Sequence, residues 1–240
     1  MAFAPVLHSE WIKIRSLRSM IWALLAIVFT TAAFSALAGL DSDGDDFDPL
    51  YSALFGINFG QAAAVAFGAT AVSSELQGGA LRLSLAAVPH RSLWFAAKMV
   101  AVGVPALAVG LVTGFVSLAV GTAVLGDKTS GLAAAEGLRG AVGCGIYLAM
   151  MALLAAGLTA LLRSGVATLS ILIPFLLIAS FVIGGVSGGI ADFLPDKAGQ
   201  VILHETSEGA LGPWTGLAVT ACWTAAALLA GAWSVRRRDA

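Results

Sequence analysis

The residues best placed to make specific contacts lie in the stretch from 71 to 98. Glu75, Arg82, Arg91 and Lys98 stand there between two long apolar runs. Ser74 and Glu75 suit the start of a helix, where an acidic group meets the positive helix end. The stretch is also interrupted by two adjacent glycines and a proline. We therefore consider it first as a contact element, with an ordinary loop carrying a short interfacial helix as the alternative.

Catalytic and metal-binding patterns are weak elsewhere in the chain. The three histidines, His8, His90 and His204, fall outside the long apolar runs, which disfavours an intramembrane hydrolase with a serine on one span and a histidine on another. The acidic run 41–48 lacks the glycine and glutamate that a calcium-binding loop requires at its sixth and twelfth positions. We read it as a solvated loop, and we expect no catalytic residue, metal or cofactor on this chain.

Composition places the chain in the membrane. Of its 240 residues 59% are hydrophobic and 11% charged, and the mean hydropathy is +0.92. A soluble domain carries about 25% charged residues. Lipid leaves only helices or closed barrels as spanning structures, and the apolar runs here do not alternate as barrel strands do. The fold class expected is an all-α membrane protein.

Six transmembrane helices account for the apolar runs. We treat residues 1–240 as one transmembrane domain without a soluble core of its own, because the connecting segments are short. The predicted spans cover residues 20–40, 53–72, 98–125, 139–161, 166–190 and 213–234.

Basic and acidic residues are distributed unequally between the two predicted sides of the membrane. With both termini inside, all but three of the 13 lysines and arginines are cytoplasmic, and all but three of the 14 acidic residues are external. The three external basic residues are then Lys128, Arg139 and Lys197. Because basic residues concentrate on the cytoplasmic side, this bias predicts an N-in/C-in topology. It also puts the stretch 71–98 in the cytoplasm.

An amphipathic segment precedes the first span. Residues 5–18 gather apolar side chains on one face, with Trp11 at its boundary and Lys13 and Arg15 on the polar face. Glu10 and Arg18 interrupt the apolar face. A basic amphipathic helix with a tryptophan suits the plane of the lipid headgroups, and a polar tail of no special role is the alternative.

The cytoplasmic stretch has a recognisable internal order. Gly78 and Gly79 form a hinge, residues 81–88 make about two helical turns that include Leu81, Leu85 and Val88, and Pro89 ends them before Arg91. We predict a short rigid helix held off the membrane.

The segment 191–212 lies on the external side. It is too apolar for a disordered loop and is interrupted by Pro195 and several glycines. We expect short helices that dip into the outer leaflet, with a partly ordered surface loop as the alternative. Acidic residues are the candidates to line an exit here: Asp192, Asp196, Glu205 and Glu208.

These motifs together resemble the type-2 ABC transporter permease family. Ser9-Glu10-Trp11-Ile-Lys13-Ile-Arg15-Ser16 is similar to the elbow helix of that family, and Ser74-Glu75-x-x-x-Gly79-x-x-Arg82-x-x-Leu85-x-x-x-Pro89-x-Arg91 resembles its first intracellular loop. Phe193-Leu-Pro195, Ala198-Gly199 and the terminal basic run look like actinobacterial members. Ala80 departs from the Gly-Thr turn that is commoner in the family, so no hydroxyl role is carried over.

The resemblance implies partners and roles. A separate ABC ATP-binding subunit would hold ATP and magnesium and dock on the loop helix, and a second permease chain would complete the pathway. Glu75 would stabilise the loop with Arg82 or with an elbow residue such as Lys13 or Arg15. Segment 191–212 would be the external re-entrant element.

The sequence thus predicts the membrane subunit of an ATP-driven exporter in the plasma membrane, for an amphiphilic or lipid-like substrate. It predicts no enzyme activity and no nucleic-acid partner. The main alternative is a non-transport membrane protein with a structural or resistance role, and the less favoured one is the intramembrane hydrolase.

Overall fold

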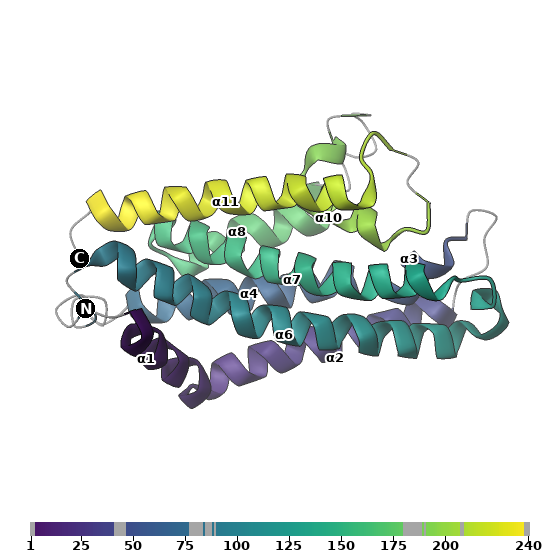
Figure 1. The fold of residues 1–240 in the computed structure, drawn as a ribbon, viewed down its shortest axis with the longest axis horizontal. Coiled ribbons are helices and arrows are strands. Elements are labelled where there is room, and N and C mark those ends of the chain that lie inside the picture. The colour runs from purple at the N-terminus through teal and green to yellow at the C-terminus, as the bar shows by residue number, and fades with distance from the viewer. Residues whose placement is uncertain are drawn as a thin grey trace.

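The computed structural model describes residues 3–40, 47–76, 84, 88, 90–179, 189, 191–206 and 209–237, and every element that they form is helical. The helices make an elongated bundle, with α1 and the C-terminal end of α11 at the same end (Figure 1). Their bounds are α1 (Phe3–Ser16), α2 (Arg18–Leu40), α3 (Pro49–Leu54), α4 (Ile57–Leu76), α6 (Arg91–Leu125), η1 (Gly126–Thr129), α7 (Ala134–Leu162), α8 (Gly165–Pro174), η2 (Phe175–Ala179), η3 (Ala191–Phe193), α10 (Pro195–Gln200), η4 (Val201–Leu203) and α11 (Pro213–Arg237).

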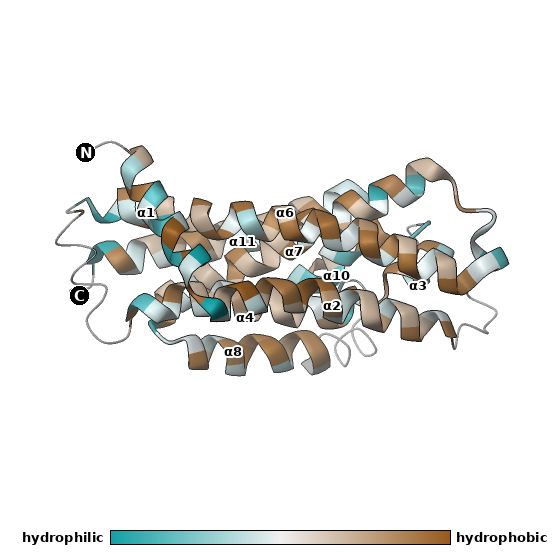
Figure 2. Cartoon of the chain, turned by 90° about the horizontal axis from the view of Figure 1, so that it is seen from below, coloured by the Kyte–Doolittle hydropathy of each residue, from teal (hydrophilic) through white to brown (hydrophobic). Residues whose placement is uncertain are grey.

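Helices α2, α6, α7 and α11 are each long and apolar enough to cross a membrane. Hydrophobic residues dominate their middle portions, whereas hydrophilic residues gather on α1 and towards the two ends of the bundle (Figure 2). Apolar side chains such as Trp22, Phe29 and Leu229 are exposed on the outside. In water these side chains would be a liability, but lipid solvates them, so the chain is a membrane-embedded protein.

Four of the six predicted spans are therefore confirmed as membrane-length apolar helices. The predicted span 53–72 is divided: α3 ends at Leu54 and the 20-residue α4 follows, and α4 is not among the four. Helix α8 and the π-helical η2 cover 165–179 of the predicted span 166–190. The remainder lies outside the described residues except Gly189. Helix α6 begins at Arg91, seven residues before the predicted boundary at 98, and runs unbroken through Pro105.

Helix α7 is the centre of the bundle and packs against α6, α11 and α4. Small residues allow these helices to approach closely. A Cβ atom on Gly114 of α6 would lie 2.2 Å from the carbonyl oxygen of Ala141, and one on Gly68 of α4 would lie 1.9 Å from that of Ala152. Backbones in such contact exchange many dispersion contacts, which drive helix association in lipid, where the hydrophobic effect is absent.

The elbow helix differs from its predicted bounds. It covers Phe3–Ser16 rather than 5–18, and Arg18 belongs to α2. The reason is local: the carbonyl of Leu17 accepts hydrogen bonds from Met20 and Ile21, so the chain starts a new helix there. Pro5 is tolerated because the first turn of a helix has no acceptors for its backbone N–H groups.

The described part of the segment 191–212 contains three short helices, η3, α10 and η4. Pro195 occupies the first turn of α10, and α10 packs on α11. The hydroxyl of Thr220 donates to the Pro195 carbonyl at 2.8 Å, which ties the segment to the bundle. The prediction of short helices over 191–212 is thus confirmed for the described part.

Adding a single methyl group at Gly68 tests the close approach of α4 and α7. Alanine favours helices by about 0.5–1 kcal/mol over glycine, yet Gly68→Ala must push Ala152 away, an overpacking that typically costs about 1–3 kcal/mol. We expect a lower midpoint of thermal unfolding in detergent. Gly131→Ala is the control, because nothing lies within 4 Å of a Cβ atom there. An unchanged midpoint for Gly68→Ala contradicts the packing.

Candidate functional site

A cluster of four charged side chains joins three helices at the end of the bundle where α1 lies. Glu10 and Lys13 come from α1, Glu75 from the C-terminal end of α4 and Lys98 from the second turn of α6. The prediction that Ser74 and Glu75 begin a helix is therefore wrong: both lie in the last turn of α4, where the neighbouring lysines and not a positive helix end balance the Glu75 carboxylate. Glu10, Glu75 and Lys98 are almost completely buried, with 1%, 5% and 2% exposed surface. We call these four residues the charged joint.

Each basic group of the charged joint contacts both carboxylates. The Lys98 ammonium donates to Glu10 Oε2 at 2.9 Å and also to Glu75 Oε1. The Lys13 ammonium donates to Glu10 Oε1 at 2.7 Å and to Glu75 Oε1 at 3.1 Å. Two positive and two negative charges therefore neutralise one another without water between them.

Ser84 connects the stretch 71–98 to the charged joint. Its hydroxyl donates to Glu75 Oε2 at 3.4 Å and accepts from the Lys13 ammonium at 3.3 Å. The N–H of Val88 donates to the Ser84 carbonyl at 2.9 Å, which is the spacing of an α-helical turn. One side chain of the predicted docking helix thus touches the charged cluster directly.

The charges are stable there only because they are paired. Partial burial lowers the pKa of Lys13, but the hydrogen bond to Glu10 and the attraction of Glu75 and Glu10 outweigh it, so its pKa is raised above the usual 10.5. Lys13 therefore stays protonated at physiological pH. Removing one partner of a buried pair leaves an uncompensated charge, which is far more costly than the pair is stabilising.

A cavity of about 340 Å³ lies beside the charged joint. Its other lining residues, apart from Ser84, are Ile14, Leu17, Met20, Ala71 and Ser74. It opens among α1, α2 and α4 and gives the joint an apolar border on one side.

The sequence-predicted residues are only partly brought together here. The ion pair between Glu75 and Lys13 is one that the family resemblance implies, and the structure contains it. Trp11, Arg15 and Arg18 are exposed and lie outside the joint. The predicted residues Gly78, Gly79, Leu81, Arg82, Leu85 and Pro89 lie outside the described residues.

Arg91 connects the start of α6, within the stretch 71–98, to the last helix. Its guanidinium donates to the carbonyl of Val235 near the end of α11, at 3.2 Å. Trp94 and Phe95 follow Arg91 in α6 and are buried in the bundle, with 2% and 6% exposed surface. They are buried because α6 begins at Arg91, so that both rings lie in its first turn and a half, against the core.

Sequence reasoning missed the roles of Glu10 and Lys98. Glu10 was read as an interruption of an apolar face, and Lys98 as one charge among several in the stretch 71–98. A signal was present in the sequence: a glutamate on an otherwise apolar helical face requires a buried partner.

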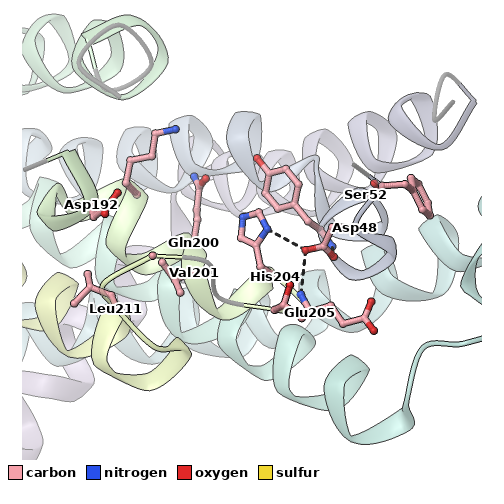
Figure 3. A pocket seen from close by; sticks show the side chains of 13 residues that line it. Asp48, Ser52, Asp192, Gln200, Val201, His204, Glu205 and Leu211 are labelled. Carbon is pink, nitrogen blue, oxygen red and sulfur yellow. Dashed lines mark hydrogen bonds and ion pairs between the residues drawn. The ribbon is translucent and has the colours of Figure 1, made fainter. Parts of the chain in front are cut away.

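A second cavity, of about 860 Å³, lies at the opposite end of the bundle (Figure 3). We call it the end cavity. Helix α3 contributes Tyr51 and Ser52, and residues from the ranges 192–206 and 209–211 form most of the remaining wall. Its lining residues are Phe47, Asp48, Tyr51, Ser52, Asp192, Lys197, Gln200, Val201, His204, Glu205, Thr206, Gly209 and Leu211.

Asp48 fastens the chain at residues 204 and 205 to α3. Its carboxylate caps α3 by accepting from the Tyr51 N–H, and its Oδ2 lies 3.0 Å from His204 Nδ1 and 3.0 Å from the Glu205 N–H. Partial burial acts to raise the pKa of Asp48, but the hydrogen bonds from His204, Tyr51 and Glu205 outweigh it and hold the pKa below 3.8. The reading of 41–48 as a solvated loop is thus wrong for Asp48, and 41–46 lie outside the described residues.

Two further contacts hold the same segment. The ring of Tyr51 stacks on His204 with centroids 4.2 Å apart, and Arg139 of α7 donates to the carbonyl of His204 at 2.6 Å. The backbone at 204–205 is therefore held between α3 and α7.

Uncharged polar side chains continue from the end cavity into the bundle. The amide of Asn58 donates to the Tyr51 hydroxyl at 3.0 Å, and the amide of Gln61 donates to the Asn58 carbonyl at 3.1 Å. Gln61 also accepts from the hydroxyl of Tyr147, which in turn accepts from Gln200 at 3.5 Å. Gln61, Tyr147 and Gln200 are all at least nine-tenths buried.

The predicted exit residues are divided between two positions. Asp192 and Glu205 line the end cavity. Asp196 does not: it is buried, with 3% exposed surface, within α10. Pro195 is buried and contributes its carbonyl to Thr220, while Glu208 lies outside the described residues. No group of three or more residues that could bind a metal ion occurs in the part of the chain that the structure describes.

The fold and the two polar regions define a helical membrane protein with a charged joint at one end and a polar cavity at the other. Comparison with known proteins adds no closer identification: no protein-family model matches the chain, and no curated protein matches it.

Replacing Lys98 tests the charged joint. Lys98→Met keeps the length of the side chain but leaves Glu10 and Glu75 with only Lys13 between them. We expect a loss of about 3–5 kcal/mol in stability, measured as a lower midpoint of thermal unfolding in detergent. Arg15→Met removes an exposed positive charge from α1 and should change little.

The charge balance can be partly restored in the same assay. The double variant Glu10→Gln, Lys98→Met removes one charge of each sign, so we expect it to be more stable than Lys98→Met alone. Equal midpoints for Lys98→Met and Arg15→Met would show that the joint contributes nothing.

Asp48→Ala tests the attachment of the chain at residues 204 and 205 to α3. It removes the helix cap, worth about 1 kcal/mol, and the two bonds to residues 204 and 205. We expect trypsin to cut the purified protein several times faster after the exposed Lys197. Ser164→Ala also removes a helix cap, that of α8, but should leave cleavage at Lys197 unchanged. Equal cleavage in both variants contradicts this role of Asp48.

Proposed function

We propose that this chain is the membrane subunit of an ATP-driven exporter in the plasma membrane, coupled to a separate ATP-binding subunit. The observation that carries the proposal is the charged joint, in which α1, α4 and α6 meet through ion pairs and Ser84 joins them by hydrogen bonds. A soluble motor acting on the cytoplasmic stretch would move Ser84 and Glu75 together, and with them the ends of two long helices.

The joint suits the transmission of force. Buried ion pairs lose much of their stabilisation when they separate, because the charges are then left desolvated. The four groups therefore tend to move as one body. Helix α6 has 35 residues, so it extends about 50 Å at 1.5 Å per residue, far enough to carry a displacement from the joint across a bilayer.

The spans are suited to an amphiphilic substrate. Within the described residues, the four membrane-length helices place their charged side chains at or near their ends: Arg18, Arg91, Lys98, Glu136, Arg139, Arg236 and Arg237. The intervening surface is apolar or uncharged, which favours a lipid-like or amphiphilic molecule over a small ion. The proposed assembly contains two permease chains, with both termini cytoplasmic and six spans in each.

A non-transport role is the alternative. The same joint would then only fasten the elbow helix to the bundle, and no ATP-binding chain would associate. The intramembrane hydrolase gains little support: the ring of His204 is hydrogen-bonded to Asp48, but no described hydroxyl makes a hydrogen bond to that ring.

Isolation of the native complex tests the proposal. We expect the tagged chain, solubilised from its own membrane in a mild detergent, to carry a stoichiometric ATP-binding protein with a Gly-x-x-x-x-Gly-Lys loop. If no such protein is recovered after cross-linking before solubilisation, the exporter proposal fails.

The coupling role of the joint is tested in the reconstituted complex. Glu75→Gln keeps the size of the side chain but removes a charge that both lysines contact, so we expect substrate-stimulated ATP hydrolysis to fall at least about tenfold while membrane insertion is unchanged. Glu136→Gln, at the start of α7 and far from the joint, is the control. Unchanged stimulation in Glu75→Gln contradicts docking through this element.

A further inference from the structure

The end cavity has the size of a ligand-binding site. Its volume of about 860 Å³ falls within the range of about 300–1,000 Å³ typical of pockets for small organic molecules. It is formed by α3, α10, η4 and the chain that follows η4, so its walls come from segments far apart in the sequence. Nothing in the proposed coupling mechanism requires a cavity at this end of the bundle.

Gln200 is a polar residue in the lining of this cavity, and its side chain has a hydrogen-bond acceptor that no described residue uses, the amide oxygen. The side chain is 7% exposed and donates to the Tyr147 hydroxyl at 3.5 Å, the long limit of a hydrogen bond. Its amide oxygen accepts no hydrogen bond from the described residues. Figure 3 shows the side chain between Asp192 and His204. An amide oxygen that lines a cavity without a hydrogen-bond donor favours a ligand that donates one.

The other polar groups of the lining also favour a ligand that donates hydrogen bonds and carries a positive charge. Asp48, Asp192 and Glu205 bring three carboxylates to the lining, against Lys197 as its one lysine or arginine among the described residues. Asp48 is engaged by His204 and by two backbone N–H groups, which leaves Asp192 and Glu205 as acceptors. Arg139 lies behind the wall, with its guanidinium directed at backbone carbonyls.

Aromatic and apolar surfaces complete the lining. The stacked rings of Tyr51 and His204 offer a π-face, which attracts cations. Val201 and Leu211 offer apolar contact for a neighbouring hydrocarbon part. We propose that the end cavity binds the ammonium group of a cationic amphiphile, held by Asp192 and the amide oxygen of Gln200, while Glu205 adds negative charge elsewhere in the lining. The inference that the cavity binds such a ligand rests on the proposed function in one respect only, namely that the ligand would be the transported substrate.

Binding to the purified chain alone, in a neutral detergent, tests the inference. The probe is a dansyl-tagged long-chain alkylamine, and its match is the dansyl-tagged alcohol of the same length, which partitions into micelles by the same apolar chain. We expect the amine to bind at least about tenfold more tightly than the alcohol, because it adds charge-assisted hydrogen bonds. Equal affinities overturn the inference.

Variants locate the site. Asp192→Asn and Gln200→Leu should each weaken binding of the amine several-fold and leave binding of the alcohol unchanged. Lys197→Gln removes a repelling charge and should strengthen binding of the amine several-fold, a gain that misfolding cannot produce. Asp127→Asn removes an exposed carboxylate outside the cavity and serves as the control. If Asp192→Asn, Gln200→Leu and Lys197→Gln all bind the amine as the unmodified chain does, the cavity is not the site.

The two proposals fail separately. Amine binding is measured without any ATP-binding chain, so its loss leaves the copurification and ATPase results intact. Conversely, failure to recover an ATP-binding chain leaves a cation-binding membrane protein in place.

Discussion

Burying charge in a low-dielectric environment is the constraint on which this structure depends most. Glu10, Glu75 and Lys98 are nearly inaccessible to water, and each would be costly alone. They are tolerated because the two carboxylates and the two ammonium groups contact one another in every combination. This requirement fixes the position of α1 against the bundle more firmly than its short apolar face could, since that face buries only Val6 and Ile14 besides Glu10.

Close packing of the helices stabilises the middle of the bundle, between the two polar ends. Helix α7 lies in the middle and presents glycine and alanine to α6, α4 and α11, so backbones approach within contact distance. Small side chains lose little conformational entropy on burial, and the resulting dispersion contacts need no polar groups. The apolar part of the molecule thus provides general cohesion, whereas the charged joint and the polar chain from Tyr51 to Gln200 provide specific alignment at the two ends.

The sequence predicted the parts of the fold that depend on hydropathy over long windows. Helices α2, α6, α7 and α11 correspond to predicted spans, because 18 or more apolar residues leave few other structures in lipid. It could not predict the break between α3 and α4. There the Gly56 N–H is bonded by Ser35 of α2 at 3.1 Å, a contact that only the packed bundle reveals.

The same limit explains the outcome at the two polar regions. Glu75 was identified from its place in a local motif, but its partner Lys98 is 23 residues away and the partner of Lys98 on α1 is 88 residues away. Tyr147 lies in an apolar run with no local signal, and Gln200 lies in a segment whose path is set by Thr220 and Asp48. Local patterns indicate which residues are out of place in an apolar helix, but they do not identify the residue that satisfies each one.

Helix α4 is held by polar contacts at both of its ends, by Asn58 and Gln61 at one and by Glu75 at the other. A helix that makes specific polar contacts at only one end can rotate about its own axis at the other end. A displacement applied at that other end is then not passed along the helix. With specific bonds at both ends, spinning α4 would break hydrogen bonds or ion pairs at one end or the other, whereas tilting it can keep both sets. Within the proposed function, a movement applied at Glu75 would therefore reach Asn58 as a tilt of α4 and not as a rotation of the helix about its own axis.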